Sequence, residues 1–169
     1  MPRVSVIIPA RDEANHVAAA IGSVRKTKYP QDLVEVIVVD NGSRDSTVAE
    51  VQREGETVIE RPGILVGAVR NRGAGISKGK VLVFIDADVM IKPDFVRSAV
   101  DKLRDEGIGA VGGVCTAPET GSWIERAWVV ERVREEYETA SLSGASLVLR
   151  RKVFEQVGGF DEGLSAGED

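Results

Sequence analysis

The sequence is poor in cysteine and histidine and has no long apolar run. Its 169 residues contain one cysteine, Cys115, and one histidine, His16. These counts exclude an internal disulfide and argue against a zinc site built from Cys and His. No apolar stretch approaches the roughly 18 residues of a membrane span, and the N-terminus lacks a signal-peptide pattern. We therefore expect a cytoplasmic protein. A location at the inner face of the cell membrane is compatible with the same observations.

An excess of positive charge is also missing. The chain has 22 Lys and Arg against 27 Asp and Glu, a net charge of −5. This balance, without any dense basic tract, argues against nucleic acid as a partner. Hydrophobic residues make up 43% and charged residues 29%, which is ordinary for a globular protein of one domain. Composition thus leaves a small-molecule enzyme or a binding module open.

What the sequence does contain is a regular alternation of apolar runs and helical patterns up to residue 114. Strands are expected at 4–8, 34–40, 57–61, 81–85 and 109–114. Helices are expected at about 15–27, 46–54 and 67–79, and from Pro93 to Gly107. This alternation predicts βαβ units and an α/β fold with a mostly parallel sheet. Pro9 is expected to close the first strand, and Thr47 with Glu50 has the spacing of a capping box.

The alternation breaks after residue 114. A longer amphipathic helix is expected at 123–139, a short strand at 147–149 and a short helix at 152–157. Trp123 and Trp128 lie on the long periodic helix, so packing against the sheet is favoured over stacking on a sugar.

Two carboxylates, Asp86 and Asp88, directly follow the apolar strand 81–85. In an extended backbone residues i and i+2 point to the same side, so the two acids are expected to converge. Like charges held together favour a bound divalent cation. An EF-hand is disfavoured because Ile91 stands at the sixth loop position, which requires glycine. Helix capping or an Asx-turn is the alternative explanation of this pattern.

Other acids follow other strands. Asp12 and Glu13 come after the first strand, and Asp40 ends the second. Parallel strands end at one edge of a sheet, so these acids are expected beside Asp86 and Asp88. Such a cluster suits a hydroxyl-rich ligand such as ribose, with a metal ion meeting phosphates. Neither a Walker A motif nor G-x-G-x-x-G follows the first strand, which disfavours an ordinary NTPase or dinucleotide site.

Five segments, in order, resemble the family 2 glycosyltransferases, which have the GT-A fold. They are the opening strand and loop 4–13, the segment 38–47, Arg70-Asn71-x-Gly73, Asp86-Ala87-Asp88, and the stretch from Gly144 to Gly167-Glu168-Asp169. The resemblance covers essentially the whole chain. It implies a single GT-A domain over 1–169, with a nucleotide-sugar-binding half at 1–114 and the start of an acceptor half at 115–169.

The resemblance also implies a reaction and roles. The expected activity is metal-dependent, inverting transfer of a sugar from a UDP- or GDP-linked donor to an acceptor hydroxyl that the sequence does not identify. Asp169 would be the general base, and Asp88 with Asp86 would bind Mn²⁺ or Mg²⁺. Asp40, helped by Glu13 and Arg70, would contact the nucleobase and ribose, and Asp86 the ribose. Further substrate-binding residues are expected at the matching positions Pro9, Ala10, Arg11 and Gly144.

Two departures from the family pattern stand out. Asp12 occupies a position that is often Asn, which leaves its role open. Family members continue beyond the Glu-Asp motif, sometimes with membrane segments, so we expect this chain to be a fragment truncated in the acceptor half. Two alternatives remain: a catalytically silent nucleotide-sugar-binding module, or a sugar-1-phosphate nucleotidylyltransferase. The second would need a Gly-rich, basic loop after the first strand, unlike residues 9–13.

Overall fold

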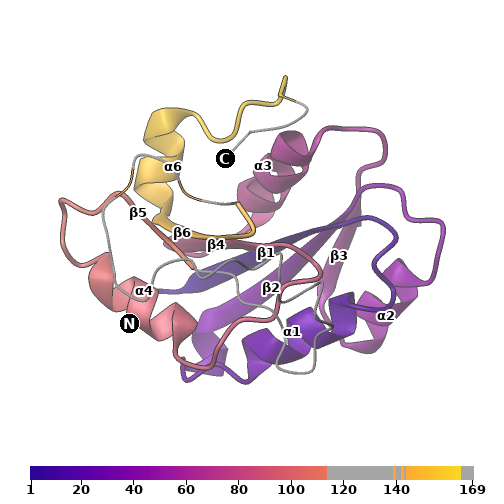
Figure 1. Ribbon diagram of the computed structural model, residues 1–169, viewed down its shortest axis with the longest axis horizontal. Coiled ribbons are helices and arrows are strands. Elements are labelled where there is room, and N and C mark those ends of the chain that lie inside the picture. The colour runs from indigo at the N-terminus through magenta and orange to yellow at the C-terminus, as the bar shows by residue number, and fades with distance from the viewer. Residues whose placement is uncertain (114–138, 140–141, 143, 165–169) are drawn as a thin grey trace, which may run out of the picture.

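Strands and helices alternate along most of the chain in the computed structural model, which describes residues 1–113, 139, 142 and 144–164. The described residues form one six-stranded sheet with helices on both faces (Figure 1). In chain order the elements are β1 (Val4–Ala10), α1 (Val17–Arg25), the 3-10 turn η1 (Gln31–Leu33), β2 (Val34–Asp40), α2 (Thr47–Arg53), β3 (Thr57–Glu60), α3 (Val66–Ile76), β4 (Val81–Ile85), α4 (Phe95–Lys102), β5 (Ala110–Gly112), β6 (Ser146–Arg150) and α6 (Arg151–Val157).

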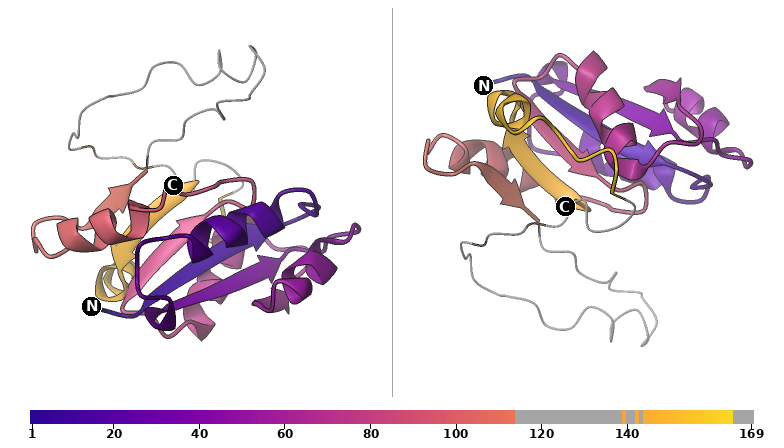
Figure 2. Two further views of the ribbon diagram at one scale, coloured as in Figure 1. Left: turned by 90° about the horizontal axis from the view of Figure 1, so that it is seen from below. Right: turned by 90° about the horizontal axis from the view of Figure 1, so that it is seen from above.

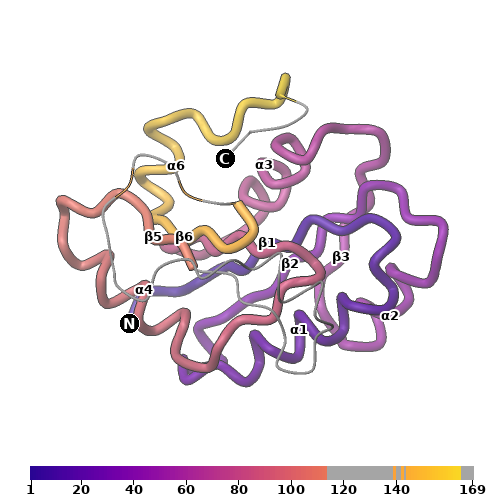
Figure 3. The backbone as a smooth tube through the Cα atoms, viewed as in Figure 1, coloured from indigo at the N-terminus to yellow at the C-terminus, as the bar shows by residue number. Residues whose placement is uncertain are grey.

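The sheet has the strand order β3-β2-β1-β4-β6-β5. β3, β2, β1 and β4 are paired in parallel, whereas β6 is antiparallel to both β4 and β5. The predicted α/β class with a mostly parallel sheet is therefore confirmed. From β1 the chain moves outward to β2 and β3, and α3 then returns it to β4 on the other side of β1 (Figure 3). The crevice at such a reversal is where open α/β sheets bind their ligands.

Each face of the sheet has its own hydrophobic core. Along β1, Val4, Val6 and Ile8 point into the core under α1 and α4, while Ile7 points into the core under α3 and α6. This follows from the alternation of side chains along a strand. Figures 1 and 2 show α1, α2 and α4 on one face of the sheet and α3 and α6 on the other. Strands buried on both faces explain the nearly continuous apolar runs in the sequence.

Pro9 does not end β1, contrary to expectation: the strand continues to Ala10, which is paired with Asp40 of β2. Pairing between β1 and β4 already stops at Ile7. The carbonyl of Ala10 accepts a hydrogen bond from Asn41 on the β2 side. Successive peptide groups point to opposite neighbours, so the Pro9 nitrogen faces the unpaired β4 side, where its missing N–H costs nothing.

α3 approaches the sheet closely because a glycine faces it. A Cβ on Gly73 would lie 2.4 Å from Cγ2 of Ile7 in β1. The expectation that small residues in this segment allow close backbone approach is confirmed. The observed helix begins at Val66 and ends at Ile76.

Two consecutive arginines close the ends of two helices on opposite faces of the sheet. Arg150 donates to the carbonyls of Leu103 and Ile108, both at 2.8 Å, beyond α4. Arg151 donates to the carbonyls of Ala74 and Ser77, at 3.1 and 3.0 Å, at the end of α3. Carbonyls at helix ends lack partners within the helix, so these guanidinium groups stabilise both ends.

Within the described residues, no helix is both long and apolar enough to span a bilayer. The long helix expected at 123–139, with Trp123 and Trp128, lies outside the described residues apart from its last position, as does Cys115.

Candidate active site

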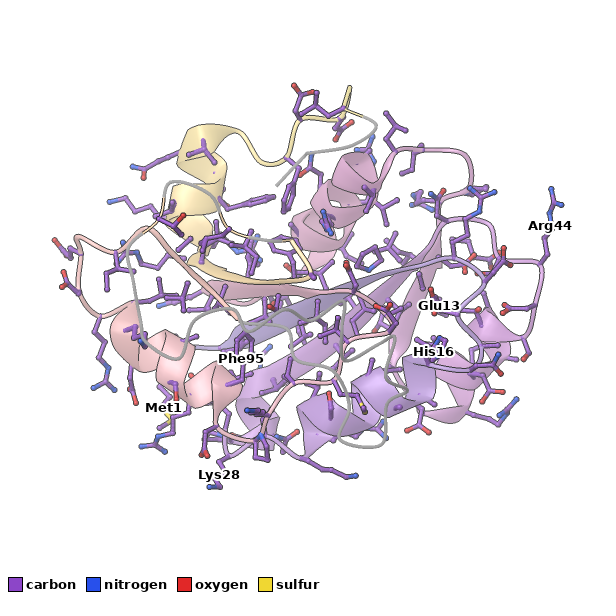
Figure 4. The ribbon with its side chains drawn as sticks, viewed as in Figure 1. Met1, Glu13, His16, Lys28, Arg44 and Phe95 are labelled. Atoms are coloured by element: carbon purple, nitrogen blue, oxygen red, sulfur yellow. The ribbon has the colours of Figure 1, made fainter. Side chains whose placement is uncertain are left out.

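The loops that follow β1, β2 and β4 lie at one edge of the sheet, on both sides of the chain reversal. Parallel pairing of β1 with β2 and β4 brings these three strand ends together, as predicted. Figure 4 shows Glu13, His16 and Arg44 at this end of the molecule and Met1 at the other. A cavity of about 440 Å³, lined partly by Lys80, Val81 and Arg150, lies beside the start of β4, away from these loops.

Asp40, at the end of β2, is buried and organises the turn that follows it. Asp40 is only 1% exposed. Oδ2 accepts hydrogen bonds from the backbone N–H groups of Gly42 and Ser43, each at 3.0 Å, and Oδ1 accepts from the Ser43 hydroxyl. These donors replace the water that the carboxylate loses on burial. The structure therefore places Asp40 beneath the turn 41–43.

Asp12 links the loop after β1 to the loop after β2. Its φ of +56° lies in the left-handed region, which Asn and Asp adopt more readily than other non-glycine residues. The Asp12 N–H donates to Ser43 Oγ at 2.9 Å, and the Arg44 N–H donates to Asp12 Oδ1 at 2.7 Å. An Asn side chain at this position would offer the same kind of acceptor oxygen to the Arg44 N–H, so this loop suits either residue.

Thr47 and Asp45 make a second link between the same loops. The Glu13 N–H donates to Thr47 Oγ1 at 2.8 Å, and the Ala14 N–H donates to Asp45 Oδ2 at 3.1 Å. The Thr47 hydroxyl donates to Asp45 Oδ1, and this hydrogen bond is the main cause that lowers the pKa of Asp45. The expected capping box of Thr47 with Glu50 is wrong: Ser46 is the N-cap, without a side-chain cap bond, and Thr47 is used between loops.

Asn41 ties in a third loop, the one after β3. Its Nδ2 donates to the Ile64 carbonyl at 2.8 Å, and its Oδ1 accepts from the Ile64 N–H at 3.3 Å. Six side chains thus hold the loops after β1, β2 and β3 in fixed relation. We call them the strand-exit network: Asp12, Asp40, Asn41, Ser43, Asp45 and Thr47.

The Asp86-Ala87-Asp88 motif forms a turn directly after β4. The strand ends at Ile85, and the Val89 N–H donates to the Asp86 carbonyl at 3.0 Å. The extended geometry expected for the two acids is therefore wrong, because strand alternation stops before the motif begins. Asp88 is exposed, and the side chain of Asp86 is 37% exposed. The Asp86 N–H donates to the Ala145 carbonyl at 3.3 Å, which places Gly144 close to this turn.

Arg70 reaches Asp86 from α3. Its side chain is only 4% exposed, and Nη2 lies 3.1 Å from Asp86 Oδ1. The Arg70 Cζ atom also lies 5.3 Å from the ring centroid of Phe160, within cation–π range. A buried guanidinium with these two neighbours has little freedom to move. It therefore fixes one oxygen of Asp86 and leaves the side chain partly open to solvent.

The other predicted substrate-binding residues lie around the first loop. Ala10 is buried, Arg11 is exposed, and Glu13 is intermediate. Glu13 Oε2 lies 2.8 Å from Nδ1 of the exposed His16. The structure thus brings Pro9, Ala10, Arg11, Glu13 and Asp40 to one loop cluster, and Arg70, Asp86, Asp88 and Gly144 to the neighbouring one. Asp169, the predicted base, lies outside the described residues.

The residues at the β4 exit fit a hard divalent cation. Two carboxylates are available there, and the described part of the chain contains no group of three or more His, Cys, Asp or Glu arranged to hold a metal. Mg²⁺ is typically held by one or two carboxylates together with substrate phosphates and water, and Mn²⁺ accepts the same oxygen ligands. An ion here would thus depend on a phosphate-bearing ligand for the rest of its coordination.

Comparison with known sequences decides the family. The profile described as Glycosyl transferase family 2 matches residues 5–158, which is most of the chain. The chain belongs to glycosyl transferase family 2. It is 32% identical over 181 aligned positions to Glycosyltransferase AglE of Haloferax volcanii, covering 100% of this chain and 59% of AglE. The chain therefore spans little more than half of the length of that relative.

Solved structures have the same fold. The mannosyltransferase PcManGT from Pyrobaculum calidifontis, in complex with GDP-Man and Mn²⁺, is 27% identical with a TM-score of 0.77, over 99% of this chain and 50% of that one. TarS 1-349 of S. aureus, in complex with UDP-GlcNAc, is 20% identical with a TM-score of 0.80, over 99% of this chain and 51% of that one. The GT-A fold expected for a family 2 member is therefore confirmed.

Sequence reasoning missed the linking roles of Ser43, Asp45 and Thr47, and the place of Phe160 against Arg70. A signal for the first was present. Residues 41–47 are dense in Asn, Asp, Ser and Thr, the side chains that most often bond nearby backbone N–H groups. The partner amides, however, lie some 31 to 34 positions away in the loop after β1, and only the parallel pairing of β1 with β2 brings them close. The contact of Phe160 with Arg70 had no such local signal.

Proposed function

We propose that this chain is the donor-binding part of a glycosyltransferase that moves a sugar from a nucleotide-diphosphate sugar to an acceptor hydroxyl, with metal dependence and inversion at the anomeric carbon. The observation that carries the proposal is that two clusters of bonded side chains lie at the same edge of the sheet, on either side of the chain reversal. One is the strand-exit network, and the other is the Asp86–Asp88 turn with buried Arg70. Family 2 membership supports sugar transfer as the chemistry.

The strand-exit network would bind the nucleoside. Its loops present backbone and side-chain acceptors suited to base N–H groups and ribose hydroxyls. Glu13 and the segment Pro9–Ala10–Arg11 would line this part of the site. Asp40, beneath the turn, would act by holding residues 41–43 in shape, and Arg70 would limit the pocket from the α3 side. The donors favoured are UDP- or GDP-linked sugars, in keeping with the ligands of the two structural relatives.

Asp86 and Asp88 would hold a Mn²⁺ or Mg²⁺ ion. When bound, such an ion neutralises the negative charge that builds on the diphosphate leaving group. Arg70 keeps Asp86 in one orientation, and exposed Asp88 is free to turn toward the diphosphate. Asp169 would accept the proton of the acceptor hydroxyl. The acceptor oxygen then bonds to the anomeric carbon from the face opposite the diphosphate, and the bond from that carbon to the diphosphate oxygen breaks.

Calorimetry with nucleotides tests the donor and metal assignments together. UDP and GDP are titrated into the protein with Mn²⁺ and then with EDTA, and binding of one of them is expected only with the metal. Asp88→Asn should weaken that binding by about tenfold or more. Asp94→Asn is the matched control, because Asp94 is an exposed acid paired with Lys28 away from the strand exits. Equal affinity in Mn²⁺ and in EDTA would refute the metal role.

Asp40→Ala separates the nucleoside contribution from the metal contribution. Because Asp40 shapes the turn beneath the nucleoside, this change should weaken nucleotide binding even at saturating metal. Unchanged affinity for UDP and GDP in a folded Asp40→Ala protein would refute this assignment. Donor binding without any sugar transfer, in a protein that carries the whole acceptor region, would instead favour a silent binding module.

A further inference from the structure

The segment 158–162 lies against α3 and is shaped to do so. A Cβ on Gly67 of α3 would lie 2.7 Å from the Asp161 carbonyl oxygen, so the two backbones approach closely. Gly158 and Gly159 have φ values of +85° and +81°, in the left-handed region that glycine adopts without strain. A Cβ on Gly159 would also lie 2.7 Å from Asn71 Oδ1. Both the local conformation and the contact with α3 therefore require glycine at 159.

Asn71 of α3 fixes Phe160 by its backbone. Its Nδ2 donates to the Phe160 carbonyl at 2.9 Å, and its Oδ1 accepts from the Phe160 N–H at 3.0 Å. A third bond runs from Nδ2 to Glu162 Oε1 at 3.0 Å. An amide that donates to and accepts from the same residue sets both the position and the direction of that residue's backbone.

The Phe160 ring is held in turn by two other aromatic rings. Its centroid lies 5.0 Å from that of Phe84 in an edge-on arrangement, and 5.9 Å from that of Phe154. The Arg70 guanidinium lies over this ring, with Cζ 5.3 Å from the centroid. Arg70 is buried, and its Nη2 bonds to Asp86 Oδ1. A continuous series of contacts thus runs from Asn71 through Phe160 and Arg70 to Asp86.

We propose that Asn71 and Phe160 are positioning residues for the carboxylate of Asp86. Asn71 sets Phe160, Phe160 sets the plane of the Arg70 guanidinium, and Arg70 sets Asp86. The segment that leads toward Glu168 and Asp169 therefore also fixes the acid on the donor side of the site. The consequence for metal affinity rests on the proposed function, whereas the orientation of Arg70 does not.

Arginine side-chain NMR measures that orientation without any ligand. A guanidinium fixed by an ion pair and a ring gives a shifted, sharp Nε–H signal, assigned to Arg70 by Arg70→Lys. Asn71→Ala and Phe160→Leu are expected to move and broaden this signal. Phe95→Leu is the matched control, because Phe95 packs against the hydrophobic core on the opposite face of the sheet. It removes similar aromatic packing, and the Arg70 signal should stay sharp.

Nucleotide calorimetry then measures the effect on the metal site. Asn71→Ala should weaken Mn²⁺-dependent UDP or GDP binding by about tenfold, as is usual when a residue that orients a metal ligand is lost. In an Arg70→Lys background the same change should have little further effect, because the series is already broken. Glu162→Ala, which removes only the outer partner of Asn71, should leave affinity within about twofold of the wild type.

Each outcome decides the proposal. An unchanged Arg70 signal in folded Asn71→Ala and Phe160→Leu proteins overturns the positioning role, as do additive losses in the Arg70→Lys background. If the wild-type protein binds no nucleotide with Mn²⁺, the proposed function fails. The NMR comparison then still decides whether Asn71 and Phe160 position Arg70.

Discussion

Asp40 at the end of β2 and Asp86 directly after β4 lie at the same edge of the sheet, yet they differ in burial and in the origin of their hydrogen-bond donors. Asp40 is 1% exposed, and its carboxylate accepts from two backbone N–H groups and one hydroxyl of the turn that follows. The side chain of Asp86 is 37% exposed, and one of its oxygens bonds to a guanidinium from another element, Arg70 of α3. The donors to Asp40 thus come from the next three residues of the chain, whereas Arg70, which donates to Asp86, lies on a helix that precedes it.

This difference separates two ways of building a site. Local donors at Asp40 hold the turn in shape and leave the residue almost no exposed surface, so we expect Asp40 to act by shaping its neighbours. Arg70 orients Asp86 from the buried side and leaves the acid accessible. A residue that must meet a ligand directly is better served by the second arrangement, because its side chain is oriented and still partly exposed to solvent. The following predictions test this contrast, beginning with the largest expected effect.

Removing each acid should affect different properties. Asp40→Ala leaves the N–H groups of Gly42 and Ser43 without their acceptor, so we expect the free energy of unfolding to fall by about 3 kcal/mol. Asp86→Asn keeps an acceptor oxygen for Arg70 but removes the counter-charge of a buried guanidinium, so it should cost less than Asp40→Ala, about 1–2 kcal/mol, while it abolishes metal-dependent nucleotide binding. Urea denaturation and calorimetry measure both. A loss of stability in Asp86→Asn as large as that in Asp40→Ala would contradict the contrast.

The contact of Arg70 with Asp86 requires α3 to lie close to the sheet, and Gly73 permits this close approach. A Cβ at Gly73 would meet Ile7 Cγ2 at 2.4 Å and Val39 Cγ2 at 3.1 Å. Gly73→Ala should therefore cost about 1–3 kcal/mol and weaken the Arg70–Asp86 contact. Gly75→Ala, in the same helix, meets nothing within 4 Å and should instead stabilise the protein by about 0.5–1 kcal/mol. Equal effects of the two substitutions in thermal denaturation would disprove the close-approach explanation.

Within the strand-exit network, Ser43 joins Asp40 to the loop after β1. Ser43→Ala removes the acceptor of the Asp12 N–H and the hydroxyl bond to Asp40, so we expect a loss of about 1 kcal/mol. Ser46→Ala is the control, since exposed Ser46 makes no side-chain cap bond to α2. Hydrogen exchange at the Asp12 amide should accelerate in the first variant alone. Protection of that amide in Ser43→Ala would show that the two loops are joined by other contacts.

The sequence predicts the elements that depend on local pattern. β2 and β4 lie within the expected bounds, because apolar runs buried on both faces leave a strong signal. The sequence also predicts at which edge of the sheet the acids lie, because that edge depends only on the parallel pairing of the strands. The strand ends are less predictable. Pro9 lies inside β1, because at this position β1 is no longer paired with β4 and needs no N–H on that side.

Contacts over long separations account for the rest. The turn at Asp86–Val89 replaces an extended strand end, and the hydrogen bond from Asp86 N–H to Ala145 that accompanies it spans 59 residues of chain. Asn71 meets Phe160 across 89 positions. Neither contact produces a periodic pattern that could be recognised in a single sequence. The motif around Arg70 and Asn71 indicated that these residues matter, but not that Arg70 bonds to Asp86 and Asn71 to the backbone of Phe160.

The smallest expected effect concerns Asp45, the exposed acid of the strand-exit network. Its hydrogen bond from Thr47 lowers its pKa below the ordinary value of 3.8, with further contributions from the backbone N–H groups of Thr47 and Ala14. A lowered pKa in the folded protein means that the carboxylate stabilises the fold fully above the ordinary value. That stabilisation is lost as pH falls through the folded pKa. Asp45→Asn should therefore lower the melting temperature slightly near neutral pH, and the difference from wild type should shrink as pH falls below about 4. Asp32→Asn makes the same change in net charge on η1, outside the network, and controls for it. A difference between wild type and Asp45→Asn that stays constant down to about pH 3 would mean that Thr47 bonds to Asp45 without favouring its charged form.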